Sequence, residues 1–194
     1  MTGNESARKP RRDAARNREK LIAAAAALVA EGEGELSLAT VAERAGVGIG
    51  TLYRHFPSRD ALLAALYGNE VDRLRDLADM LLEELSPLEA LTTWIGRYAQ
   101  LMAVKYGLAD AMKSALRSEQ TIFAHSKSQT VGAMTKLLAA AEKAGDVRPD
   151  IDPQDVLSGI AAIVSANLGS EESRTRAERL LAFLVDGLRY RAER

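Results

Sequence analysis

The sequence predicts an all-α protein, with a small N-terminal helical domain followed by a helical bundle. Apolar residues recur every three or four positions along most of the 194 residues, which is the spacing of amphipathic helices. Capping residues and glycines separate these stretches. Apolar and polar residues nowhere alternate over a sustained run, so no sheet is expected. The expected helices, about nine, cover 13–31, 38–45, 48–56, 58–85, 87–107, 109–118, 121–144, 153–168 and 172–191.

Local signals predict the ends of the first three helices. Leu21 and Leu28 mark the apolar face of the first helix, which glycines end. Ser37 can cap the second helix, because its hydroxyl can accept a hydrogen bond from an N–H group of the first turn. Gly46 follows, where a helix end favours a left-handed residue. A third helix, 48–56, starts immediately after this tight turn.

The later helices have equally clear boundaries. Pro57 cannot continue a helix, and Ser58 can cap the next one, which is long enough to connect the N-terminal domain rigidly to the bundle. The Ser-Pro-Leu-Glu sequence at 86–89 predicts a capping box with proline in the first turn. Gly145 ends a later helix, and the Asp-Pro pair at 152–153 begins another.

Composition restricts the class of protein. The chain has no cysteine, which excludes a disulfide framework and thiolate metal sites and agrees with a reducing cytoplasm. No apolar run reaches the length of about 18 residues that indicates a membrane span. Residues 21–30 are apolar and follow a basic segment, as in a signal peptide, but acidic residues and glycine come next without a suitable cleavage site. We therefore expect a cytoplasmic protein.

The net charge of −1 hides a basic N-terminus. Residues 1–20 carry seven basic and three acidic side chains, so this segment has a charge of +4 and the remainder a charge of −5. Residues 1–12 are polar and include Pro10, and we expect them to form a disordered basic arm. A basic arm of this kind suits a protein that contacts a nucleic acid through one end only. The alternative is an ordinary solvated tail.

The second and third helices form the most informative pattern. Two short helices joined by a turn of about three or four residues that contains glycine are typical of the helix-turn-helix, whose second helix enters the DNA major groove. Leu52 and Phe56, four residues apart, are expected to face the core. This motif therefore predicts binding to double-stranded DNA.

The run AERAGVGIGTLYRHFPSRDALLAAL, at 42–66, resembles the N-terminal domain of the TetR family of bacterial transcriptional regulators. The shared features are the AGV turn, the GTLY-x-HF recognition helix, the Pro-Ser-basic-acidic start of the next helix and an amphipathic helix upstream. The resemblance covers roughly 18–71, and beyond it only the size and the all-helical layout are similar. It implies a dimeric, ligand-responsive regulator, most often a repressor, that binds a palindromic operator.

The resemblance also implies which residues contact DNA. Tyr53 and His55 are similar to phosphate-contacting positions of the family, with packing as the alternative for Tyr53 and an ordinary surface position for His55. Thr51 can reach a base edge or a phosphate, and Arg59 can pair with a phosphate. The candidate DNA-binding residues are Ser37, Thr40, Ile49, Gly50, Thr51, Tyr53, Arg54, His55 and Arg59.

Four positions in this motif differ from the family pattern or have a particular interpretation. Gly48 stands where the family usually has a serine or threonine cap. Ile49 replaces a residue that is often polar or basic, and it can meet a thymine methyl group. Gly50 lets the backbone approach DNA. Thr40 stands where a capping box has glutamate, so it either contacts DNA or leaves the cap less complete.

Aromatic and methionine residues are concentrated between positions 94 and 134. The resemblance places a small-molecule pocket in this region, and such side chains suit an adaptable apolar pocket. Plain core packing is the alternative for each of them, and Gln100 and Asn167 can orient a ligand or face solvent. The candidate ligand-binding residues are Trp94, Tyr98, Met102, Tyr106 and Phe123, and the expected effector is a small apolar or amphipathic molecule.

The last two expected helices, 153–168 and 172–191, carry more apolar surface than one inward stripe requires. They also contain small residues that allow close helix approach. The resemblance implies that this pair forms a two-fold, four-helix interface between two copies. A homodimer also agrees with the helix-turn-helix, because two symmetric copies read a palindrome.

No catalytic or cofactor site is evident in the sequence. It has no glycine-rich phosphate loop and no nucleophile–histidine–acid arrangement, and His55 and His125 lack metal-ligand spacing. We expect no enzyme activity, metal or cofactor. The expected division is an arm at 1–12, a helix-turn-helix domain at 13–57 and a ligand-binding and dimerisation domain at 58–194. The alternatives are a helical small-molecule-binding protein or enzyme with a vestigial DNA-binding domain, and a regulator that activates rather than represses.

Overall fold

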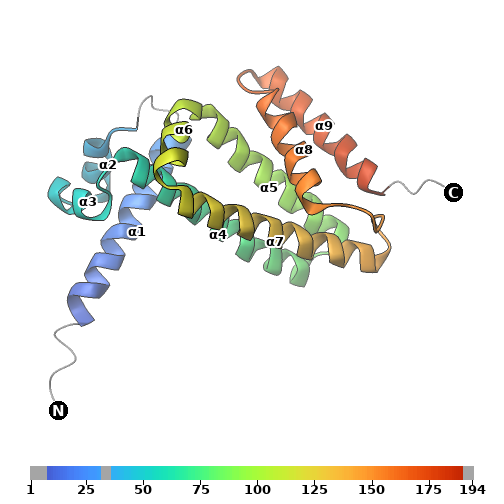
Figure 1. Ribbon diagram of the computed structural model, residues 1–194, viewed down its shortest axis with the longest axis horizontal. Helices are drawn as coiled ribbons and strands as arrows, with labels where there is room; N and C mark the ends of the chain where they lie inside the picture. Colours follow the sequence, from blue (N-terminus) through green and yellow to red (C-terminus); the bar gives the residue numbers. More distant parts are fainter. Residues whose placement is uncertain (1–7, 32–35, 190–194) are drawn as a thin grey trace, which may run out of the picture.

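The computed structural model describes residues 8–31 and 36–189, which form nine α-helices and no strand. Their number and order confirm the all-α prediction (Figure 1). The helices are α1 (Arg8–Glu31), α2 (Leu38–Ala45), α3 (Ile49–His55), α4 (Arg59–Glu84), α5 (Pro87–Gly107), α6 (Ala109–Ser118), α7 (Gln120–Ala144), α8 (Pro153–Ser165) and α9 (Glu171–Arg189).

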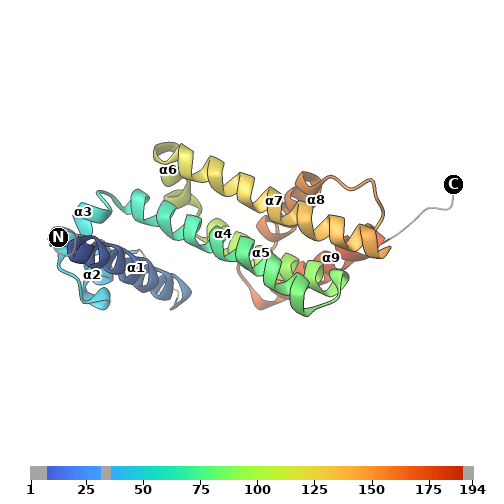
Figure 2. The ribbon, with the colours of Figure 1, turned by 90° about the horizontal axis from the view of Figure 1, so that it is seen from below.

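The molecule is elongated, with α2 and α3 at one end and α8 and α9 toward the other (Figures 1 and 2). Helices α4, α5 and α7 run along its length. The longest of them, α4, packs against α1 near one end and against α5, α6 and α7 along its course. It therefore connects the helix-turn-helix directly to the bundle, as its length in the sequence predicted. Among the described helices, none combines the length and the apolar composition that a membrane span requires.

Two hydrophobic cores fill the molecule. The first joins α1, α2 and α3 to the N-terminal half of α4 and is closed by residues of α6 and α7. The second joins the C-terminal half of α4 to α5, α7, α8 and α9. Tyr67, in the N-terminal half of α4, packs against both cores. The first core thus continues past residue 57, because Leu62, Leu63 and Leu66 of α4 belong to it.

Most predicted helix ends are confirmed. The hydroxyl of Ser58 accepts a hydrogen bond from the Ala61 N–H at 3.1 Å, which caps α4. In the capping box of α5, the Ser86 N–H donates to Glu89 at 3.2 Å. Hydrogen bonds from the hydroxyl and then the N–H of Ser86 lower the pKa of the Glu89 carboxyl. Gly145 ends α7 in the left-handed conformation, with φ of 82°.

The beginning of α1 differs from the expectation. This helix starts at Arg8, so residues 8–12, which the sequence placed in a disordered arm, are helical. Pro10 does not prevent this, because it lies in the first turn, where an N–H group has no helical acceptor. The rest of the expected arm, residues 1–7, lies outside the described residues.

The end of α8 also differs, since the helix stops at Ser165 rather than at residue 168. The side-chain amide of Asn167 donates to the carbonyl of Ile163 at 2.8 Å. This bond satisfies one of the last carbonyls of α8 in place of a backbone N–H, which favours the end of the helix. Asn167 is therefore a helix-terminating residue in this structure.

Candidate functional site

The turn between α2 and α3 sets the angle between these helices. Gly46 is left-handed, with φ of 62°, and its N–H donates to the Glu43 carbonyl at 3.0 Å. The Val47 N–H donates to the Ala42 carbonyl at 3.0 Å. These two bonds form a Schellman motif, which closes α2 by backbone contacts alone. The next helix begins at once, with Gly48 as its N-cap.

We expect Gly46→Ala to lower the free energy of unfolding by about 1–2 kcal/mol, because a Cβ is disfavoured in the left-handed region. Thermal unfolding followed by circular dichroism measures this loss. The matched control is Gly96→Ala, at an exposed residue within α5 where a Cβ would meet nothing within 4 Å. The control should be at least as stable as the wild type, because alanine is favoured over glycine within a helix, and equal losses in the two variants would contradict the assignment.

Helix α3 presents one face to the core and another to solvent. Leu52 is 0% exposed, which confirms its predicted place in the core. The side chains of Ile49 and Tyr53, one turn apart, are 46% and 52% exposed. Gly50 and Arg54 are also one turn apart and exposed. The outer surface of α3 therefore combines a large apolar residue, a phenol and a guanidinium on a helix of a size that the major groove accepts.

The remaining candidates for DNA contact lie on or beside α2 and α3. Ser37 caps α2, because its hydroxyl accepts from the Thr40 N–H at 3.5 Å, and both residues are exposed. Thr51 and His55 of α3 are partly exposed. Arg59, the first residue of α4, is partly buried. All the candidates thus belong to α2, α3 and the start of α4, which lie together at one end of the molecule (Figure 1).

Helix α1 holds this unit in place. Arg44, in the last turn of α2, makes a bidentate ion pair with Glu31 at the end of α1, with nitrogen–oxygen distances of 2.5 and 2.6 Å. The hydrogen bonds from Arg44 lower the pKa of the Glu31 carboxyl. At the other end of the unit, the guanidinium of Arg18 lies 5.4 Å from the ring centre of Phe56, which is 2% exposed. A movement of α1 would therefore be transmitted to α2 and α3.

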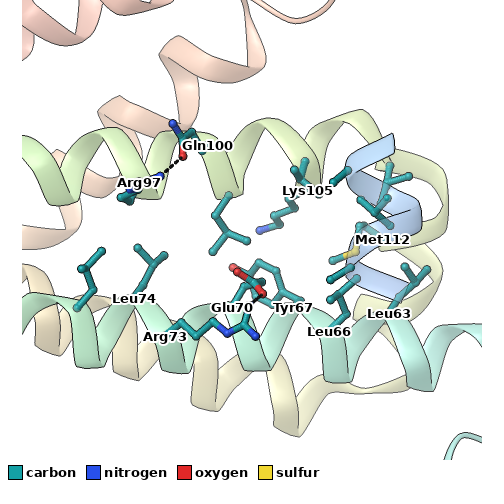
Figure 3. Close-up of a pocket in the computed structure, with 17 residues that line it drawn as sticks. Leu63, Leu66, Tyr67, Glu70, Arg73, Leu74, Arg97, Gln100, Lys105 and Met112 are labelled. Carbon is teal, nitrogen blue, oxygen red and sulfur yellow. Dashed lines mark hydrogen bonds and ion pairs between the residues drawn. The ribbon is translucent and has the colours of Figure 1, made fainter. Parts of the chain in front are cut away.

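A cavity of about 450 Å³ lies between α1, α4, α5 and α6 (Figure 3). Its wall joins the two cores, since Leu63 and Leu66 belong to the first, Leu74 belongs to the second, and Tyr67 packs against both. The C-terminal half of α1 contributes Val29 and two alanines. The volume falls in the range of about 300–1,000 Å³ that is typical of small-molecule sites.

Few polar groups line this mostly apolar cavity. Glu70 and Arg73 of α4 form an ion pair at 2.7 Å, and the Arg97 guanidinium donates to Gln100 at 3.3 Å on α5 (Figure 3). Lys105 points from α5 toward α4, and burial lowers the pKa of its ammonium. Such a site can hold a molecule with an apolar body and a polar group.

The phenol of Tyr67 also belongs to this wall. Burial, and then the neighbouring Tyr106, raise the pKa of Tyr67 to about 12. Tyr67 is therefore a neutral phenol at physiological pH and can act as a hydrogen-bond donor in the cavity.

Three of the predicted ligand-binding residues lie in the second core beside the cavity rather than in its wall. Trp94 is 0% exposed and stacks on Tyr98, with ring centres 5.5 Å apart. Its indole N–H donates to the Leu74 carbonyl at 2.8 Å. Met102 is 1% exposed in the same core. Because Leu74 lines the cavity, Trp94 contacts the wall from behind.

The other two predicted residues also support the wall from outside. Phe123 of α7 belongs to the first core and stacks on Tyr67, with ring centres 5.1 Å apart. Tyr106 is partly buried, with its ring centre 6.0 Å from the Lys105 nitrogen. The sequence did carry a signal for the wall itself, because Arg97, Leu101 and Lys105, which line the cavity, recur every four positions on α5.

Helices α8 and α9 pack closely and leave an apolar face uncovered. A Cβ on Gly159 of α8 would lie 2.9 Å from Cδ1 of Leu184 on α9, so a larger residue there would require the Leu184 side chain to shift. Leu168 and Leu180 are 40% and 38% exposed. Phe183 is 72% exposed, the highest value for a large apolar side chain in the described part of the chain. Apolar surface of this kind marks interaction sites in many proteins.

Comparison with protein families gives two matches along the chain. The model described as bacterial regulatory proteins, tetR family, matches residues 21–66, which contain α2 and α3. The model described as transcriptional regulator SbtR-like, C-terminal domain, matches residues 86–190, more than half of the chain. The unmatched residues between them, 67–85, contain the larger, C-terminal part of α4.

Known proteins with similar sequences and structures agree with these matches. A TetR transcriptional regulator from Streptomyces coelicolor is 40% identical, and the match covers 90% of this chain and 99% of that chain with a TM-score of 0.77. A TetR transcription regulatory protein from Mycobacterium vanbaalenii is 33% identical, with coverages of 93% and 99% and a TM-score of 0.69. The repressor KstR of Mycolicibacterium smegmatis is 34% identical over 100 residues, or 50% of this chain and 49% of that relative. The chain thus spans about half the length of this relative.

Proposed function

Because the chain belongs to the TetR family of bacterial transcriptional regulators, we propose that it is a dimeric repressor that a small amphipathic molecule releases from a palindromic operator. The observation that supports a response to a ligand is the location of the cavity, whose wall includes residues of both cores. A molecule bound there contacts the bundle and the support of the helix-turn-helix at once.

In this proposal α3 enters the major groove. Tyr53 and His55 bind phosphates, while Thr51 and the Gly50 backbone approach base edges. The exposed side chain of Ile49, where a polar residue is common in the family, contacts a thymine methyl group. The operator would then contain thymine at a defined position of each half-site.

The uncovered face of α8 and α9 forms the dimer interface in this proposal. Leu180 and Phe183 supply its apolar centre, and the two-fold axis relates the two copies. The recognition helices of a dimer on adjacent half-sites lie about 34–36 Å apart. Any change in this distance reduces the affinity for a palindrome.

The coupling between cavity and DNA runs through α4 and α6. Met112 of α6 lines the cavity, and Ser114 of the same helix donates to Asp60 in the first turn of α4 at 2.6 Å. Displacing α6 therefore moves the residues that follow α3. A ligand shifts the population only as far as it prefers the released form, and a change from 1:99 to 99:1 needs about 5.5 kcal/mol of preference.

Tyr53→Ala tests the DNA-binding part of the proposal. Each hydrogen bond to a phosphate contributes about 1.5–3 kcal/mol, and a dimer loses two, so operator affinity should fall by at least about a hundredfold. The loss should be similar for all sequences, because phosphates carry no sequence information. Gel shifts with the DNA that precedes the gene of this protein, and with unrelated DNA, measure both effects.

The control is Met80→Ala, on α4 far from α3. The side chain of Met80 is 54% exposed and that of Tyr53 is 52% exposed, so both variants truncate a similarly exposed side chain. The Met80→Ala variant should bind the operator like the wild type. Thr51→Ala should change the sequence preference more than the overall affinity. Unchanged operator binding by both α3 variants would remove the assignment of this helix as the reading element.

A further inference from the structure

The charges around the cavity identify the chemical class of its ligand. We propose that the cavity takes an amphipathic organic anion, a carboxylate on an apolar body, and that the ammonium of Lys105 is the partner of the carboxylate. This inference rests on the proposed function, because it assigns the chemistry of the effector to the same cavity.

Positive charge exceeds negative charge in the wall. Arg73, Arg97 and Lys105 line it together with a single carboxylate, that of Glu70. Glu70 is already paired with Arg73 at 2.7 Å. Arg97 donates to the amide oxygen of Gln100, which is uncharged. Two positive charges, those of Arg97 and Lys105, therefore face the cavity without an acidic partner among its lining residues.

Lys105 is better placed than Arg97 to bind a ligand carboxylate. Its side chain is partly buried and directed into the space between α5 and α4 (Figure 3). Its nitrogen lies 5.4 Å from the ring centre of Tyr67 and 6.0 Å from that of Tyr106. Within the described part of the chain no carboxylate lies at ion-pair distance from it. The two rings compensate only part of the cost of desolvating the charge.

A ligand carboxylate would complete this environment. It would pair with the ammonium of Lys105, and the neutral phenol of Tyr67 could donate a hydrogen bond to it. We therefore expect the cavity to prefer an anion to a neutral molecule, because only an anion offsets the cost of removing the ammonium from water.

The rest of the cavity requires an apolar body on the same molecule. Leu63, Leu66 and Leu74 of α4 face Leu101 and Val104 of α5 across a volume of about 450 Å³. An inorganic anion would leave these walls in contact with water, whereas a hydrocarbon chain or ring would cover them. The combination of one partly buried cation and apolar walls fits a medium-sized carboxylic acid.

A matched series of ligands tests the proposal on the full-length protein. The carboxylates from hexanoate to dodecanoate are compared with the primary alcohols and primary amines of equal chain length. Calorimetry measures binding. The fluorescence of Trp94 reports on it independently, because the Trp94 indole donates a hydrogen bond to the carbonyl of Leu74, a residue of the wall. We expect the best carboxylate to bind at least about tenfold more tightly than its alcohol, the size of one charge-assisted hydrogen bond.

Variants of Lys105 identify the partner of the carboxylate. Lys105→Gln should remove the preference for the carboxylate over the alcohol, and Lys105→Arg should retain most of it. The control is Lys127→Gln, which removes an exposed lysine of α7 that does not line the cavity and should keep the preference. Far-UV circular dichroism and urea unfolding of each variant separate a loss of binding from a loss of folding.

Three results would overturn the inference. They are equal binding of carboxylate and alcohol, a preference that persists in Lys105→Gln, and a series in which no carboxylate binds. Tighter binding of the amines would point to Glu70 as the ligand partner instead. A gel shift with ligand-free protein tests the regulator proposal separately, because failure to bind DNA would refute that proposal whatever the result with the carboxylates.

Discussion

Replacing Phe183 with glutamate should convert the proposed dimer into a monomer. Phe183 is 72% exposed in the single chain and lies near Leu180 on α9, whose exposed fraction is 38%. In the proposed dimer both copies of Phe183 become buried. An unpaired buried carboxylate costs about 3–5 kcal/mol, so the dissociation constant should rise by at least about a hundredfold. Sedimentation velocity at micromolar concentration measures the change.

The same variant should lose tight binding to the operator, because a monomer contacts only one half-site. Ala139→Glu adds the same charge at an exposed position of α7 and serves as the control that stays dimeric. Phe183→Leu keeps an apolar side chain and should also remain a dimer. A wild-type protein that sediments as a monomer at this concentration would show that α8 and α9 do not form the interface.

Replacing Trp94 with alanine should lower the free energy of unfolding by about 3–5 kcal/mol. Trp94 is 0% exposed, stacks on Tyr98 and donates its indole N–H to the Leu74 carbonyl at 2.8 Å. The variant loses this packing and leaves a buried carbonyl without its donor. Such a loss is a large part of the total stability of about 5–15 kcal/mol that is typical of a protein domain. Urea unfolding followed by circular dichroism measures it.

Trp94→Phe distinguishes packing from hydrogen bonding at this position. The variant keeps most of the ring volume and loses the bond to Leu74, so we expect a smaller destabilisation of about 1–3 kcal/mol. If Trp94→Ala instead unfolds like the wild type and loses only ligand binding, Trp94 belongs to the ligand site and not to the core. That result would favour the interpretation based on sequence alone.

Short-range chemistry explains why much of the fold could be predicted. Ser58 and Asp152 cap helices as expected, and Gly46 takes the left-handed conformation at the end of α2. These features depend on residues only a few positions apart, and the sequence displays them directly. Leu52 and Phe56 face the core for the same reason, since helical spacing decides which side is inward.

Helix boundaries were less predictable where two local signals compete. Pro10 indicates a break in the middle of a helix but is tolerated in the first turn, so it did not reveal that α1 begins at Arg8. Asn167 suits either a surface position or a ligand contact, and its bond to the Ile163 carbonyl became evident only in the folded chain. In both cases the outcome depends on which backbone groups need a partner.

The two candidate sites differ in the same respect. The helix-turn-helix occupies one continuous stretch, 37–59, and the sequence by itself determined its turn, its inward residues and its exposed face. The cavity is built from α1, α4, α5 and α6, which come together only through packing. Trp94 and Leu74 are 20 residues apart, and their hydrogen bond decides that the indole supports the wall rather than faces the ligand. Only the tertiary structure could decide this, because the identity of an aromatic residue does not specify which neighbouring helix covers it.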